Sequence, residues 1–321
     1  MRIVFGVADR SIELWHLIEN VEIMINGLTW RGEVPPARVV WVDSGGYQAM
    51  VKGVRLELRE VVARYRELDA HLYMSLDQPP RRLCPRDPAL VKLNISNYEE
   101  LRALVDKEIV PVVHCYDPEL MLEAVDCYRS LGAKVIAYGG AVPPSMGRMG
   151  RGSRLIPIIA LAIVVKAGRL PVHVLGLGGA NTMYAVLSRI GAASFDSSAW
   201  RIKAAYGKVI VPGLGERYVG DRRVKFGRTA LSREEYEVLR RGLEKTGFPY
   251  IDRLDELLKT FRGRALINAW ILFKFRDVVA PRNGMKWLVG EATRLASMPL
   301  SELIEVFYNR LKMAVDRSVA I

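Results

Sequence analysis

The chain gathers its most versatile side chains in one short stretch, Asp43-Ser44-Gly45-Gly46-Tyr47-Gln48. The stretch directly follows an apolar run over residues 38–42 that is typical of a β-strand. Such a set suits a flat polar heterocycle, because the glycines let the backbone approach it, the ring stacks on it and the polar groups read its edge. A plain Gly-Gly turn after a strand is the alternative interpretation.

Two further acidic residues, Asp77 and Asp196, also follow apolar runs. A carboxylate at the end of a buried strand is costly unless it has a partner or a function. Two carboxylates that face one pocket suit glycosidic chemistry, in which one attacks an anomeric carbon and another manages the proton of the leaving group. A single aspartate more often caps a helix or bonds a loop, but three at successive strand ends favour function.

The elements that would position these residues are short apolar runs that alternate with amphipathic stretches. Runs rich in Val, Ile and Tyr indicate strands buried on both faces, over residues 2–7, 21–25, 38–42, 72–76, 110–114, 134–138, 171–175 and 193–195. Helix-like stretches cover residues 54–68, 118–131 and 181–190. We therefore predict an α/β fold, a (β/α)8 TIM barrel, with an open doubly wound sheet as the alternative.

The positions of the polar residues favour the barrel over the open sheet. A different predicted strand precedes each of Asp43, Asp77, His114, Gly139-Gly140, Gly176 and Asp196. In a barrel these strand ends meet at one mouth, whereas in an open sheet they would be spread along an edge.

The chain divides into three parts. Residues 1–200 carry the core of the barrel with its catalytic mouth. Residues 201–230 are a basic, glycine-rich insertion in which we predict a small β-hairpin pair. Residues 231–321 supply the closing barrel helix and a C-terminal helical extension, with helices over residues 232–246, 251–261, 264–279, 286–296 and 301–317.

The composition favours a nucleic-acid partner. The 321 residues carry a formal net charge of +12, and such an excess favours a polyanion over an arginine-rich surface that is merely solvated. Met1 opens a predicted strand rather than a signal peptide, and the longest apolar stretch, residues 155–166, is too short to span a bilayer. We therefore expect a cytoplasmic protein without a membrane partner.

The three cysteines, Cys84, Cys115 and Cys127, form no CxxC pair and so have no zinc-site spacing. We expect buried or inert thiols, no metal and no cofactor. One disulfide stays open as an alternative if the source is a hyperthermophile, because intracellular bridges occur there.

Five motifs follow one another along the chain: Asp43-Ser44-Gly45-Gly46-Tyr47-Gln48, Asp77, Gly139-Gly140-Ala141, Val174-Leu175-Gly176-Leu177-Gly178 and Phe195-Asp196-Ser197. In this order they resemble the motifs of the tRNA-guanine transglycosylases, the queuosine and archaeosine enzymes, which exchange a guanine in a nucleic acid for a 7-deazaguanine on a TIM barrel. The resemblance covers roughly residues 41–200, with a weaker similarity near residues 264–276.

The resemblance implies a pentosyltransferase whose nucleophile is Asp196, which attacks the anomeric carbon and forms a covalent ester. It implies that Asp43 binds the base and moves its proton, and that Asp77 reads the donor edge of guanine and of the incoming base. The remaining implied substrate-binding residues are Ser44, Gly45, Gly46, Tyr47, Gln48, Gly139, Gly140 and Gly176. The target nucleotide must leave its helix to reach the pocket, and we expect phosphates to be held by Lys208, Arg217, Arg222, Arg223 and Lys225.

The chain also departs from the family. The zinc site of three cysteines and one histidine is absent, since no cysteine follows Cys127. A Gln-Gly pair after the fifth strand is replaced by His114-Cys115, so His114 either reads the base or is a satisfied core histidine. We expect the chain to lack the extra RNA-binding domains of archaeal members, so both tRNA and DNA remain open as substrates, as do a homodimer and a partner subunit.

Two other functions remain as alternatives. Some members of the family serve as non-catalytic nucleic-acid-binding subunits, although the chain keeps both Asp43 and Asp196. A barrel glycoside hydrolase also uses two carboxylates, but sugar sites usually show more Trp and Glu at strand ends.

Overall fold

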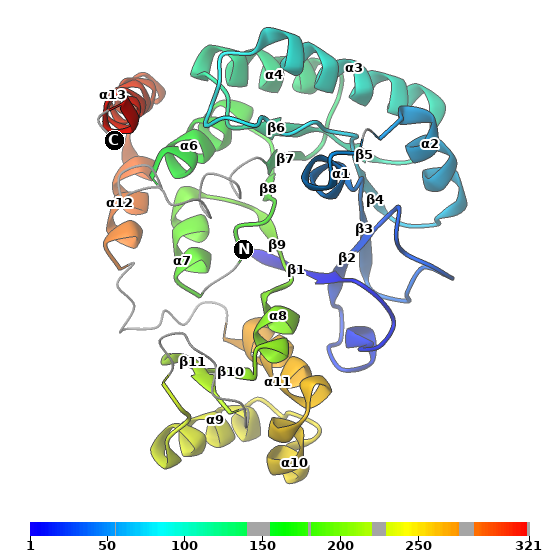
Figure 1. Ribbon diagram of the computed structural model, residues 1–321, viewed down its shortest axis with the longest axis vertical. Helices are drawn as coiled ribbons and strands as arrows, with labels where there is room; N and C mark the ends of the chain where they lie inside the picture. The colour runs from blue at the N-terminus through cyan, green and yellow to red at the C-terminus, as the bar shows by residue number, and fades with distance from the viewer. Residues whose placement is uncertain (55, 140–154, 179–180, 220–228, 276–285, 320–321) are drawn as a thin grey trace.

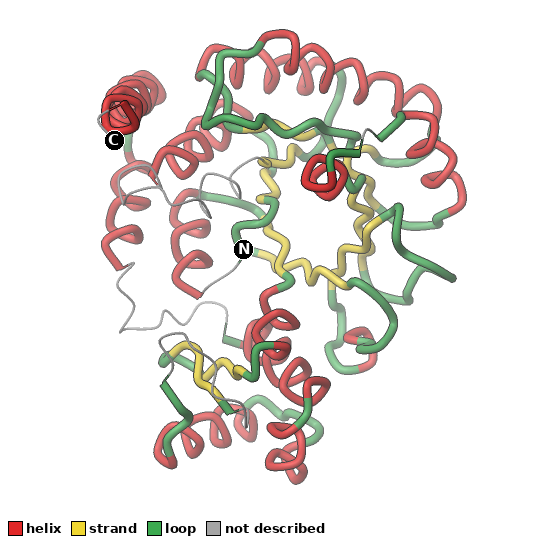
Figure 2. Tube along the Cα trace, in the orientation of Figure 1, coloured by secondary structure: helices red, strands yellow, loops and turns green. Residues whose placement is uncertain are grey.

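A computed structural model describes residues 1–54, 56–139, 155–178, 181–219, 229–275 and 286–319. Within them, nine strands form one parallel sheet with the order β5-β4-β3-β2-β1-β9-β8-β7-β6. Figure 2 shows this sheet as a ring of strands surrounded by helices. The strands are β1 (Arg2–Val7), β2 (Glu22–Asn26), β3 (Val39–Asp43), β4 (Leu72–Met74), β5 (Ile109–Val110), β6 (Val112–His114), β7 (Ile136–Gly139), β8 (Val172–Val174) and β9 (Ser194–Ser197).

The sheet closes on itself through one strand that is split in two. The sequence predicted a single strand over residues 110–114, and the structure interrupts it at Pro111, which has no backbone N–H to donate. The first half, β5, pairs with β4, and the second half, β6, pairs with β7. Counted as one strand, they complete eight parallel strands in chain order, so the predicted (β/α)8 barrel is confirmed and the open sheet is excluded.

The barrel interior is filled by the inward-facing side chains of alternate strand positions. A compact apolar group lies in its middle, made up of Val4, Met24, Trp41, Met74, Val110, Val112 and Ala137. Trp41 stacks on His173 with a centroid distance of 4.5 Å and donates to Glu22, which pairs with Arg2. This packing closes the interior, so a ligand can approach only at the ends of the strands.

Most connections on the outside of the barrel are helical (Figure 1). The helices that follow β3 to β9 are α1 (Gly46–Lys52), α2 (Leu58–Glu67), α3 (Pro88–Leu104), α4 (Pro118–Ser130), α6 (Ile156–Gly168), α7 (Asn181–Ile190) and α8 (Ala199–Ala205). Both α3 and α4 begin with proline after an aspartate cap, Asp87 and Asp117. Residues 8–21 and 27–38, before β2 and β3, hold only a short 3-10 helix, η1 (Leu14–His16).

The helix predicted over residues 54–68 begins later and has an unpredicted neighbour. Glu57 and Glu60 form a capping box that starts α2 at Leu58. The residues before it form the short helix α1, which begins directly at Gly46. Figure 1 shows α1 in front of the barrel strands, near β4 and β5. The Gly-Gly pair is therefore the entry to a helix beside the mouth and not a simple turn.

The C-terminal part consists of a hairpin and helices that pack on the barrel. It contains β10 (Lys208–Val211), β11 (Gly215–Tyr218), α9 (Arg233–Lys245), η3 (Ile251–Arg253), α10 (Leu254–Lys259), α11 (Phe261–Lys274), α12 (Lys286–Ser297) and α13 (Leu300–Val319). Asn268 of α11 accepts a hydrogen bond from the Ile210 N–H at 2.7 Å and donates to the Trp200 carbonyl at 3.1 Å. Tyr308 of α13 reaches Asp117 at 3.2 Å. The predicted helical extension is thus confirmed.

No helix among the described residues combines the length and the apolar character that a bilayer-crossing segment needs.

Candidate active site at the mouth of the barrel

Three acidic residues meet at the carboxyl ends of the strands. Asp43 ends β3, Asp196 lies in β9, and Asp77 lies three residues beyond β4. Burial and the charges of Asp77 and Asp196 together raise the pKa of Asp43 to about 7. A carboxyl group with a pKa near neutrality exchanges protons readily at physiological pH, so Asp43 is suited to act as an acid or a base.

Asp43 is held by a residue that the sequence analysis missed. Asn26 ends β2 opposite Asp43 in the sheet register and donates from Nδ2 to Asp43 Oδ2 at 3.2 Å. Its Oδ1 accepts from the N–H groups of Leu28 and Thr29, which fixes the amide. The signal was present in the sequence, because Asn26 directly follows the predicted second strand and is a polar residue at the same level of the barrel as Asp43.

The backbone fixes one carboxylate oxygen of Asp196, and among the described residues no other side chain bonds this carboxyl group. Its Oδ1 accepts the Gly176 N–H at 2.7 Å, and Gly176 adopts φ +74°, a conformation that favours glycine. Burial raises the pKa of Asp196 to about 6. The carboxyl group is therefore ionised at neutral pH, is oriented by the backbone, and has one oxygen available for attack.

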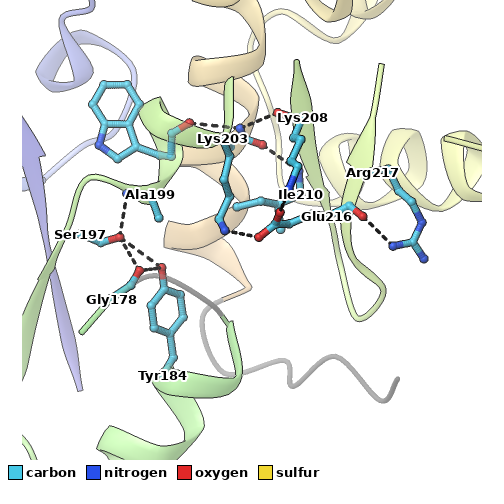
Figure 3. Close-up of polar contacts among 11 residues, drawn as sticks. Gly178, Tyr184, Ser197, Ala199, Lys203, Lys208, Ile210, Glu216 and Arg217 are labelled. Atoms are coloured by element: carbon cyan, nitrogen blue, oxygen red, sulfur yellow. Dashed lines mark hydrogen bonds and ion pairs between the residues drawn. The ribbon is translucent and has the colours of Figure 1, made fainter. Parts of the chain in front are cut away.

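Ser197, the residue after Asp196, ties the end of β9 to the start of α8 (Figure 3). The Ser197 hydroxyl donates to the Gly178 carbonyl at 2.7 Å and accepts the Ala199 N–H at 3.2 Å. Tyr184 of α7 donates to the same carbonyl at 3.2 Å. This network holds the backbone that carries the Asp196 side chain.

Asp77 is engaged on both of its carboxylate oxygens. The Ser44 hydroxyl donates to Oδ1 at 3.3 Å, and His114 Nε2 lies 2.9 Å from Oδ2. The His114 side chain is 1% exposed, and among the described residues neither of its ring nitrogens makes a hydrogen bond, although Nε2 lies close to Asp77 Oδ2. His114 is therefore not satisfied within the described protein, and its buried Nδ1 remains for a ligand or a water molecule.

Glycines let the backbone come close to these side chains. A Cβ on Gly46 would lie 2.4 Å from the Asp77 carbonyl oxygen, and a Cβ on Gly139 would lie 2.9 Å from His114 Cε1. Gly45 adopts φ +82°. A side chain at these positions would either clash or strain the backbone, so the glycines are needed for the shape of the mouth.

Several predicted site residues contribute less than expected or are not placed. Gln48 lies on α1 and is exposed. The Tyr47 side chain, Gly140, Arg222, Arg223 and Lys225 lie outside the described residues.

The structure assigns Arg217 a role different from the one expected. Its side chain is 9% exposed, pairs with Glu235 at 2.6 Å and donates to two backbone carbonyls (Figure 3 shows its link to Glu216). Lys208 pairs with Glu216 at 2.7 Å. The prediction that Arg217 binds phosphate is therefore corrected, because its guanidinium is buried and used to join the hairpin to α9.

A disulfide lies beside the mouth. Cys84, in the loop after β4, is bonded to Cys115, the residue after His114. Cys127 is a half-buried free thiol. The open alternative of one bridge is therefore the correct one, and the bridge joins the loop that contains Asp77 to the strand end that carries His114.

Among the residues that the structure describes, no group of three or more His, Cys, Asp or Glu side chains is placed to hold a metal ion.

Comparison with known proteins gives a relative by sequence and distant structural similarities, of which two are described below. No family model matches the chain. It is 30% identical over 281 residues to "Uncharacterized protein 306" of Sulfolobus islandicus rod-shaped virus 1, a match that covers 85% of this chain and 81% of the relative.

The structural similarities are weak. A flavocytochrome b2 mutant with benzoylformate is 15% identical with a TM-score of 0.34, and the match covers 62% of this chain and 57% of that chain. The carboxyl transferase domain of Rhizobium etli pyruvate carboxylase with 3-bromopyruvate is 10% identical with a TM-score of 0.35, covering 83% and 48%. The chain thus spans about half the length of these two structures, and the matches support no argument about function.

Proposed function

The chain belongs to the family of protein 306 of Sulfolobus islandicus rod-shaped virus 1, and we propose that it is a base-exchange transglycosylase that replaces guanine in tRNA or DNA with a 7-deazaguanine. The observation that carries the proposal is the acidic cluster, in which burial raises the pKa of Asp43 to about 7 and that of Asp196 to about 6. The motif resemblance to the tRNA-guanine transglycosylases supplies the substrate class.

The chemistry divides between Asp43 and Asp196, the two carboxyl groups whose pKa is raised. Ionised Asp196 attacks C1′ of the target nucleoside, an ester bond from the carboxylate to C1′ forms, and the bond from C1′ to guanine N9 breaks. Asp43 gives its proton to the leaving guanine and becomes a carboxylate. It then takes the N9 proton of the incoming base, which attacks C1′ and releases Asp196. The enzyme returns to its starting state without a cofactor.

The other groups of the mouth suit recognition of the base. The Asp77 carboxylate accepts hydrogen bonds from the edge of the guanine that carries its amino group and its N–H. Ser44 and His114 contact the two oxygens of this carboxylate and orient them. The unpartnered Nδ1 of His114 lies beside Gly139, where a Cβ would be only 3.0 Å from it. This region can bind the guanine-like edge that the outgoing and incoming bases share.

The test is covalent capture and exchange of labelled guanine. Purified protein is incubated with tRNA and with DNA that carry labelled guanine, and a denaturing gel is run with and without added 7-deazaguanine base. We expect release of label and a shifted protein band in the wild type. Asp196→Ala should lose both, and Asp69→Ala, which removes an exposed carboxylate paired with Lys107, should retain both.

The outcomes separate the alternatives. A shifted band that survives in Asp196→Ala would show that another group is the nucleophile. Release of guanine that no base replaces would indicate a hydrolase. Binding of nucleic acid without release or capture would make the chain a non-catalytic subunit, and absence of binding would remove the proposal.

A further inference from the structure

A second cavity, of about 520 Å³, lies beside the acidic cluster. It is bounded by α1, the segment that leads into α2, the loop after β4 and one face of α3. Figure 1 shows α1, α2, α3 and β4 on the same side of the barrel. Among the residues that line this cavity, only Gly46, Glu57 and Asp77 have been given a role above, so the cavity needs its own explanation.

The cavity and the acidic cluster share a thin wall. Gly46 and Asp77 line the cavity, while the Asp77 carboxylate contacts Ser44 and His114 at the mouth. The Gly46 backbone is pressed against the Asp77 carbonyl, and a Cβ would lie only 2.4 Å from it. A ligand group in the cavity would therefore lie next to, and separate from, a base bound at the mouth.

The lining of the cavity combines apolar walls with charges at its rim. Leu56, Leu76 and Leu93 supply apolar surface, and Leu93 is 43% exposed, so this wall of the cavity is open to a ligand from solvent. Arg81 is exposed and has no hydrogen-bond or ion-pair partner among the described residues. Three acidic residues line the cavity. Asp77 contacts Ser44 and His114 at the mouth and Glu57 caps α2, which leaves Glu100 to face the cavity.

We propose that this cavity binds the nucleobase next to the exchanged nucleotide, with Arg81 on the phosphate that links the two; the inference rests on the function proposed above. An unstacked base has a flat apolar face that fits between leucines, and exocyclic amino groups that a carboxylate accepts. A guanidinium is well matched to a phosphate. Neighbouring nucleotides of one strand can occupy two sites that share a wall, and holding the neighbour would help to keep the target nucleotide out of its helix.

The test compares oligonucleotides that differ at one position. The probes are short single strands of thymidine or uridine with one guanine, in which the nucleotide on either side of the guanine is intact or abasic. We expect the wild type to bind one of the abasic probes about tenfold more weakly than the intact probe, the loss typical of one base contact, and the other abasic probe equally well.

Paired variants connect this preference to the cavity. Leu93→Glu puts a charge on the apolar wall and should abolish the preference, whereas Leu104→Glu, at a similarly exposed leucine of α3 outside the cavity, should keep it. Arg81→Gln should lower the slope of log affinity against log salt by about 1, and Arg82→Gln should leave the preference for the intact probe unchanged.

The failure of this inference differs from the failure of the proposed function. If the wild type exchanges guanine but binds intact and abasic probes equally on both sides, the cavity does not bind a neighbouring base. If Leu104→Glu loses the preference as Leu93→Glu does, the effect comes from charge on α3 and the inference is wrong. If no probe binds and no guanine is exchanged, the proposed function fails, and this inference fails with it.

Discussion

At the scale of single residues, the raised pKa of Asp43 makes a prediction about stability. Between about pH 4 and pH 7 the folded chain keeps a proton on Asp43 that the unfolded chain has released, so the free energy of unfolding falls as the pH rises through this window. Asp43→Asn removes this cost and should stabilise the protein at pH 8 by about 1–3 kcal/mol, with little effect near pH 4. Urea denaturation across this range measures it.

The control is Asp69→Asn. Its neighbour Lys107 lowers the pKa of Asp69, so this variant should not gain stability at high pH. An Asp43→Asn variant whose stability follows the same pH curve as the wild type would show that the carboxyl group pays no burial cost, and the argument for its role as a proton carrier would lose its basis.

The pair of His114 and Asp77 makes a prediction about base affinity. Asp77→Ala should weaken guanine binding by roughly 1.5–3 kcal/mol, the worth of a charge-assisted hydrogen bond. His114→Ala should also weaken guanine binding, because the Asp77 carboxylate loses the contact that orients its Oδ2. His114→Gln should recover part of this loss, because the glutamine amide restores a hydrogen-bond donor. Calorimetric titration with guanine is the measurement, with His16→Ala on η1 as the exposed control. Unchanged affinity in His114→Ala would make His114 a core residue.

At the scale of elements, the disulfide ties the loop after β4 to the end of β6. Cys84 and Cys115 are buried, and the bridge closes a segment with a sequence separation of 31. Cys84→Ser should therefore lower the free energy of unfolding by about 2–4 kcal/mol, while Cys127→Ser should change it little. Thermal or denaturant unfolding, each with and without reductant, checks this. If reductant destabilises the wild type and Cys84→Ser equally, the bridge is absent in solution.

The sequence predicted most of the barrel because its strands are buried on both faces and stand out as apolar runs. The run over residues 2–7 and the helix over residues 181–190 were predicted with the boundaries that the structure has. Pro111 was missed as the break between β5 and β6, since an apolar run on both sides hides the lost hydrogen bond. The helix α1 was missed because Gly45 and Gly46 favour a turn locally, and contacts with the Asp77 loop override that preference.

The candidate site was predictable to the extent that strand ends meet in a barrel. From this rule, the sequence alone predicted that Asp43, Asp77 and Asp196 lie close together. It did not identify Asn26, because a lone asparagine after a strand is common, nor the pairing of His114 with Asp77, because it depends on the register of strands that are far apart in the sequence. Residue type alone also did not separate a buried arginine such as Arg217 from a surface one.

At the scale of the whole molecule, the net charge of +12 overstates the number of basic side chains that are available to bind a polyanion. Arg217 pairs with Glu235, and Lys208 pairs with Glu216, inside the C-terminal part.

Arg217→Ala should therefore lower the free energy of unfolding by about 1–3 kcal/mol, because Glu235 loses its buried partner. The same change should leave the salt dependence of nucleic-acid binding unchanged. The double change Arg222→Ala and Arg223→Ala should do the opposite, with a slope smaller by about 2 and unaltered stability. Filter binding over a salt series and urea denaturation, made on both variants, decide between the roles. A smaller salt slope in Arg217→Ala would return that residue to the nucleic-acid interface, and an unchanged slope in the double variant would make its segment a solvated surface.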